Sequence, residues 1–397
     1  MKSLKSQVTM IMILGIVMFI IVGLVLYIYK SSARKTTQPS IKKAQQAPFE
    51  TQPINDFVVK CVDKLSKDAI ILMGNQGGYT YKTQGGTLED FSISQQGQFF
   101  ISYKGTNVVY DISRIGLYMP QPYYSFEPDY PWVAFPYNPY LPISASSKTF
   151  TGIFGMDRMP PLNASGGSHS VQTQIETYID SNMDKCLDLS TFIQQGYDIT
   201  KAKSKTHVTI GSSDVSVKTE MPMTIFKQST KETAQLTDFS ANIDIRLREI
   251  YFFAKWLIEN DNSNITFDIK DANNNRNGFA VEVAEDAYKK DDIVAIKDTK
   301  SLVYGLPFEY DFARQNRRPA LYYLSQSVLE FPLGHQITQD DLLQGSQLKA
   351  EDPDEDTYTI TITPSVPKLM DASQIGFKVQ VTDGELNDYQ IIIVNKQ

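Results

Sequence analysis

Apolar residues recur at helical spacing in three stretches of the chain. The first stripe consists of Phe57, Val58, Cys61, Val62, Leu65, Ala69, Ile70 and Met73. The second consists of Val171, Ile175, Tyr178, Ile179, Met183, Cys186 and Leu187. The third runs from Leu247 to Ile258. A period near 3.6 residues with one apolar face predicts three helices that each pack on a core.

Strict alternation of apolar and polar residues marks other segments. Between 207 and 226, and again between 238 and 247, every second residue is apolar, and Gly-Ser-Ser-Asp interrupts the first run. This pattern predicts an antiparallel meander with one buried face. Together with the helices it indicates an α+β domain over residues 54–316, with a candidate division into two subdomains near residue 150.

The last part of the chain, residues 317–397, has a different pattern. Short apolar stretches such as "PALYYL", "IGFKVQVTDG" and "YQIIIV" alternate with turn residues at regular intervals. That spacing predicts an all-β sandwich as a separate C-terminal domain.

The first part of the chain contains an uncharged apolar run at residues 8–29. A helix of that length crosses the roughly 30 Å hydrocarbon core of a bilayer, so the run predicts a single transmembrane helix in contact with membrane lipid. Residues 1–7 are then a cytoplasmic stub, and the polar, proline-containing residues 30–53 form a stalk. More Lys and Arg residues follow the span than precede it, which alone favours the opposite orientation.

Two cysteines, Cys61 and Cys186, lie on the apolar stripes of separate predicted helices. An even count in a chain with exported character favours a disulfide between them. Two buried free thiols are the alternative, since cysteine is often a core residue. Two Asn-x-Ser/Thr sequons, at Asn163 and Asn264, are candidate glycosylation sites and agree with the bulk of the chain being extracellular at the cell membrane.

Composition excludes several functional classes. A net charge of −7 and a pI near 5.2 argue against a nucleic-acid partner. The chain has no Gly-x-Ser-x-Gly nucleophile motif, and we interpret Glu282, Glu285 and Asp286 as the solvated face of a helix. We therefore expect no catalysis. An envelope hydrolase with an accessory sandwich is an alternative.

A stretch rich in aromatic residues and proline, residues 116–142, is the candidate binding segment. Its rings Tyr124, Tyr130, Trp132 and Tyr137 suit a protein or glycan partner at the surface, because tyrosine and tryptophan bury area while keeping a polar group. Packing of these rings over a sheet is the alternative interpretation.

The C-terminal domain resembles a known family. The segments "NRRPAL", "AEDPDEDTYTI" and "FKVQVTDGELNDYQIII" resemble the cadherin-like and immunoglobulin-like repeats of prokaryotic surface proteins. The resemblance implies an immunoglobulin-like sandwich, and in those families calcium lies between consecutive domains. Asp352, Asp354 and Asp356 are the candidate calcium ligands. A hard cation needs six or more oxygens, so we favour a turn between strands and expect no cofactor.

Two further resemblances concern the rest of the chain. "FVVKCVDKL" and "MGNQGGYTY" resemble a set of archaeal single-pass envelope proteins, which implies anchoring and location and brings no known activity. "LKSQVTMIMILG" resembles the archaeal prepilin signal, which implies processing between Ser6 and Gln7 and leaves a pilin-like filament subunit as an alternative. The sequence thus predicts a membrane-anchored surface protein that acts in adhesion or envelope assembly.

Overall fold

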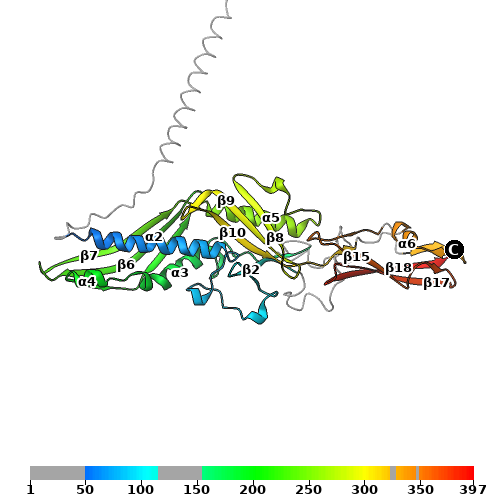
Figure 1. Ribbon diagram of the computed structural model, residues 1–397, viewed down its shortest axis with the longest axis horizontal. Coiled ribbons are helices and arrows are strands. Elements are labelled where there is room, and N and C mark those ends of the chain that lie inside the picture. Colours follow the sequence, from blue (N-terminus) through cyan, green and yellow to red (C-terminus); the bar gives the residue numbers. More distant parts are fainter. Residues whose placement is uncertain (1–49, 115–153, 322–327, 346–347) are drawn as a thin grey trace, which may run out of the picture.

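The computed structural model describes residues 50–114, 154–321, 328–345 and 348–397. Most of the regular structure in these residues is β-strand, and helices are few, an arrangement consistent with a β-sandwich. Figure 1 shows an elongated molecule with long helices and strands at one end and the C-terminal strands at the other.

One end is built from a sheet covered by two helices. The helices are α2 (Gln52–Gly74) and α3 (Val171–Cys186). The strands are β4 (Tyr197–Lys201), β5 (Lys205–Ile210), β6 (Val215–Lys227) and β7 (Glu232–Ile243), and the short helix α4 (Ser190–Gln194) precedes them. The long strand β6 pairs with β7 along one edge and with β4 and β5 along the other, all antiparallel. The predicted meander and both predicted helices are therefore present.

A second sheet continues from the first. Its strands are β1 (Phe100–Tyr103), β2 (Thr106–Ser113), β3 (Met156–Asp157), β8 (Phe279–Tyr288), β9 (Asp291–Val303) and β10 (Leu306–Arg314). Their order is β1-β2-β10-β9-β8, with β3 beside β2, and β2 and β10 pair in parallel. The third predicted helix is α5 (Leu247–Ser263), and short 3₁₀ helices lie at Lys82–Gln84, Ile93–Gln95, Ala164–Gly166 and Ala272–Asn274.

One hydrophobic cluster, which we call the N-terminal core, joins both sheets and the three long helices. It includes Ile54 and Val58 from α2, Ile175 from α3, Leu257 from α5 and Phe312 from β10, all at most 2% exposed. In a residue at the centre of such a cluster, nearly all the apolar surface is removed from contact with water. This burial is the main source of stability for the helices.

The C-terminal part has its own core. Its main sheet has the order β12-β18-β17-β15, formed by β12 (Val328–Phe331), β18 (Asn387–Lys396), β17 (Gln374–Thr382) and β15 (Thr359–Thr363). The facing elements are β11 (Ala320–Leu321), β13 (Gln336–Ile337), α6 (Gln339–Gly345), β14 (Ala350–Glu351) and β16 (Lys368–Leu369). Between them lies the C-terminal core, with Phe377, Val379, Ile337 and Met370 fully buried.

The structure corrects one interpretation of the sequence. Glu282, Glu285 and Asp286 belong to β8, which pairs with β9, and not to a helix. The apolar residues beside them, Val281, Val283 and Ala284, are only partly buried, so the run lacks a clear period.

The predicted membrane span, residues 8–29, lies outside the described residues. Within the four described ranges, no helix combines the length and the apolar character that a membrane crossing requires.

Candidate functional site

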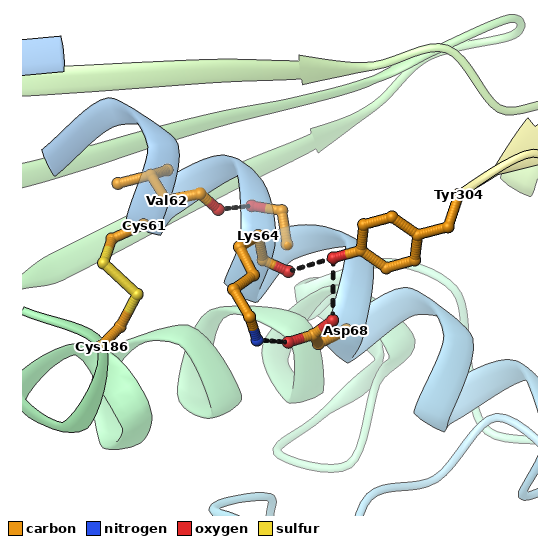
Figure 2. The surroundings of a disulfide bond; sticks show 7 residues. Cys61, Val62, Lys64, Asp68, Cys186 and Tyr304 are labelled. Atoms are coloured by element: carbon orange, nitrogen blue, oxygen red, sulfur yellow. Dashed lines mark hydrogen bonds and ion pairs between the residues drawn. A yellow bond between two sulfur atoms is a disulfide. The ribbon is translucent and has the colours of Figure 1, made fainter. Parts of the chain in front are cut away.

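The predicted disulfide is present and ties α2 to α3. Cys61 and Cys186 are bonded, and their sequence separation is 125 (Figure 2). Cys61 is 4% exposed on the face of α2 that enters the N-terminal core, and Cys186 is the last residue of α3. The bond therefore fixes the two helices beside each other at the end of α3.

The hairpin between β9 and β10 contacts α2 close to this bond. The Tyr304 hydroxyl donates to the carboxylate of Asp68 at 2.9 Å, and Lys64 forms an ion pair with the same carboxylate (Figure 2). The Lys67 ammonium lies 5.8 Å from the centre of the Tyr304 ring. These contacts attach the second sheet to the disulfide-linked helix pair, although each is partly exposed and individually weak.

The most unusual feature of the structure is a set of buried charges where the N-terminal core meets the C-terminal domain. We call it the charged joint and define it as Asp261, Asp291, Asp292, Arg314, Asn316, Arg317 and Asp354. Arg314 ends β10 and is 2% exposed, and Arg317 follows it in the connection to β11 and is 1% exposed. Fully buried arginines are rare unless carboxylates compensate them.

Arg317 joins the two parts of the chain directly. Its Nη2 lies 2.7 Å from Oδ1 of Asp354, in the acidic turn of the C-terminal domain, and 2.8 Å from Oδ2 of Asp261, in α5. Its Nε also donates to Asp354 at 3.0 Å, and its Nη2 donates to the carbonyl of Pro353 at 2.9 Å. One guanidinium thus holds a helix of the N-terminal core and a turn of the sandwich at once, with the forked geometry that arginine favours.

Arg314 completes the network from the β10 side. Its Nη2 donates to Asp292 on β9 at 2.6 Å, and its Nη1 donates to Asp261 at 3.2 Å. Asp261 is therefore shared by both arginines. The nearby Asp354 carboxylate is held ionised, because Arg317 and Arg314 lower its pKa below the usual value although burial opposes them.

A second row of polar contacts reinforces the joint. The backbone N–H of Asn316 donates to Asp291 at 2.8 Å, and its side-chain amide donates to Asp383 at 3.1 Å. Lys290 pairs with Asp356 at 2.9 Å across the same boundary. The linker residue Asn316 is therefore held from both domains, like Arg317.

The acidic turn that the sequence offered as a calcium site is largely engaged by protein groups. Asp354 pairs with Arg317 and Asp356 with Lys290, while Oδ1 of Asp352 accepts hydrogen bonds from the backbone N–H groups of Asp354 and Asp356. In the described part of the chain, no three metal-ligating side chains of His, Cys, Asp or Glu are grouped to hold an ion. Buried Oδ2 of Asp352 has no hydrogen-bond partner there. The turn that we favour and the calcium site that is its alternative both stay untested.

The other candidate residues fall in two groups. Asn163 and Asn264 are both exposed, as a glycosylation acceptor must be, and modification of either stays a prediction. Tyr124, Tyr130, Trp132 and Tyr137 lie outside the described residues, so their role in binding also stays a prediction.

The charged joint was missed by the sequence analysis, because lysine, arginine and aspartate are normally read as surface residues. One signal was available. In "ARQNRRPAL", Arg314 ends a long strand and Arg317 and Arg318 follow it closely. The comparably dense group of acids in the C-terminal domain is "EDPDED". The two segments carry opposite charge, and each lies next to a buried strand. This pattern is typical of buried charges that compensate each other.

A separate buried carboxyl, Asp311 on β10, makes stability depend on pH. It is 5% exposed, and its Oδ1 has no hydrogen-bond partner among the described residues. Burial, with the negative charge of Glu309, raises the pKa of Asp311 to about 7. The folded protein then binds a proton that the unfolded chain releases near pH 4, so the stabilising contribution falls as pH rises from about 4 to 7.

We therefore expect Asp311→Asn to reduce this pH dependence. The free energy of unfolding of the wild-type chain should fall between pH 5 and pH 8. We expect this fall to be smaller in the variant by about 2–4 kcal/mol. Denaturant unfolding at both pH values measures the difference. The matched control is Glu309→Gln, which removes a more exposed carboxylate from the same strand and should change the pH dependence much less. Parallel pH profiles for wild type and Asp311→Asn would contradict the assignment.

Comparison of the chain with models of protein families and with curated proteins finds no match, so its function is argued from its own residues.

Proposed function

We propose that this chain is a membrane-anchored cell-surface protein with a structural or binding role in adhesion or envelope assembly. In this proposal residues 8–29 span the membrane, residues 30–53 form a stalk, and a disulfide-linked α+β domain carries a terminal immunoglobulin-like or cadherin-like sandwich. The disulfide between Cys61 and Cys186 is the observation that carries the proposal, because such bonds persist mainly in oxidising compartments.

The charged joint supports a mechanical role for the extracellular part. A flexible linker would let the sandwich move independently of the rest of the chain. Here the linker residues Asn316 and Arg317 are 1% exposed and are hydrogen-bonded to groups in both domains. A sandwich held in a fixed direction at the far end of an anchored body suits a protein that presents a surface at a defined distance from the membrane.

The aromatic segment at residues 116–142 is the proposed contact with a protein or glycan partner. In the sequence it comes shortly after β2, which ends at Ser113 and pairs with the end of β10 that carries Arg314. Its ring-rich composition is what supports a binding role.

Sidedness tests the proposal directly. Ser229 lies in the exposed turn between β6 and β7, and Ser3 lies in the proposed cytoplasmic stub. Each is replaced by cysteine, and intact cells are treated with a membrane-impermeant maleimide. We expect Ser229→Cys to be labelled on intact cells and Ser3→Cys only after lysis.

Labelling in the reverse order would overturn the proposal. The two positions distinguish an exported body from an intracellular disulfide-containing protein of the kind found in some hyperthermophiles. The wild-type chain is the background control, because its two cysteines are both in the disulfide and should not react.

A further inference from the structure

The strand β15 ends the main sheet of the C-terminal domain with an open edge. β15 is hydrogen-bonded to β17 in an unbroken antiparallel register from Thr359 to Thr363. No other strand of the described chain pairs with it. Within the described residues, the backbone N–H and C=O groups of β15 that point away from β17 have no partner strand, and such edges are templates for strand addition.

The edge lacks the features by which proteins usually protect themselves from strand addition. Within residues 359–363 there is no charged residue, no proline and no bulge. Lysines, inward charges, prolines and bulges are the common protective devices. The first proline after β15 is Pro364, which limits the length of the edge.

The sequence of β15 is symmetric. It reads Thr-Ile-Thr-Ile-Thr in both directions about Thr361. The three threonines face the solvent, whereas Ile360 and Ile362 point inward and pack against the C-terminal core. An antiparallel pair formed about a two-fold axis at Thr361 brings the residue n positions before Thr361 in one copy opposite the residue n positions after it in the other. A strand that is palindromic about Thr361 therefore has identical residue types opposite each other at every position.

We propose that β15 is a self-association site at which a second copy of this chain adds its own β15 in antiparallel orientation about Thr361. Thr361 then lies opposite Thr361 of the second copy, and Ile360 opposite Ile362. Thr359 lies opposite Thr363, and threonine pairs across strands are favourable. The four-stranded sheets of the two copies become one continuous sheet with both cores on the same side.

The uncharged composition of β15 is compatible with pairing between two copies. In a two-fold contact a charge at the axis position, residue 361, would face the same charge in the second copy and repel it. β15 has none, whereas the adjacent central strand β17 carries Lys378 on the outer face, away from the proposed axis. The inference goes beyond the proposed function, since it concerns the association of the chain and not its location.

Cross-linking of the full-length chain in detergent micelles tests the register. Opposed residues in an antiparallel pair have Cα atoms about 4.5–5.5 Å apart, within the range of a disulfide. We expect Thr361→Cys to give a disulfide-linked dimer under mild copper-phenanthroline oxidation. The matched control is Gln380→Cys, since Gln380 lies directly beside Thr361 on the same face but one strand inside the edge. Equal cross-linking of both variants would overturn the proposal.

Sedimentation of the same full-length chain measures the association itself. We expect Thr361→Asp, which sets two carboxylates against each other at the axis, to weaken dimerisation by about tenfold or more, while Gln380→Asp leaves it nearly unchanged. A wild-type chain that stays monomeric, or a dimer that resists Thr361→Asp, would refute the site. If Thr361→Asp fails to fold, the cross-linking result decides alone.

Discussion

Replacing Arg317 by methionine is expected to lower the free energy of unfolding by about 3–5 kcal/mol, because removal of one partner leaves buried charge uncompensated. Arg317 makes bonds to Asp354 and Asp261, which are at most 6% exposed. Among the described residues, Arg314 is the cation that would still pair with both carboxylates. Methionine matches the length of the apolar part of the arginine side chain, so packing changes little. The loss of stability therefore measures the removal of the charge.

A double-mutant cycle separates the ion pair from general damage. In the chain that carries both Arg317→Met and Asp354→Leu, an apolar pair replaces the charged one. We expect the double variant to lose less free energy of unfolding than the two single variants lose when their losses are added, because neither charge remains unpaired. The control is Arg248→Met in α5, an exposed arginine that stacks on Phe252 and should cost about 0.5 kcal/mol or less.

Denaturant unfolding followed by two probes is the measurement, since two cores need not unfold together. Trp256 belongs to the N-terminal core, and circular dichroism reports both domains. If the free energy of unfolding of the Arg317→Met variant lies within about 1 kcal/mol of the wild-type value, the joint does not couple the domains in the way the contacts imply.

The elements that sequence analysis predicted correctly share one property. In α2, α3, α5 and β6 each element buries a single face, so the period of the apolar residues records the geometry directly. The cysteine pair was predicted on different grounds, from the even cysteine count and the exported character of the chain.

The elements that it missed bury both faces or pair across long distances. β2 is buried almost continuously and pairs in parallel with β10, about 200 residues later in the chain, a contact that no local pattern encodes. β8 was read as a helix because acids interrupt its alternation. The charged joint was invisible for a different reason, since a buried arginine is specified by its partners and Asp261, Asp292 and Asp354 come from three distant segments.

Loss of the disulfide is the second large effect that we expect. In the chain-entropy model, a bond that closes a loop of about 125 residues stabilises the folded state by roughly 4–5 kcal/mol, and measured values are often smaller. We therefore expect the double variant Cys61→Ala with Cys186→Ala to lose about 2–5 kcal/mol. The matched control is the wild-type chain treated with a reductant, which removes the bond but keeps both sulfur atoms in the core. If both forms lose the same stability, the covalent link is responsible. A larger loss in the alanine variant alone would assign the difference to the cavity left at Cys61, which is 4% exposed, and unchanged stability in both would contradict a structural role for the bond.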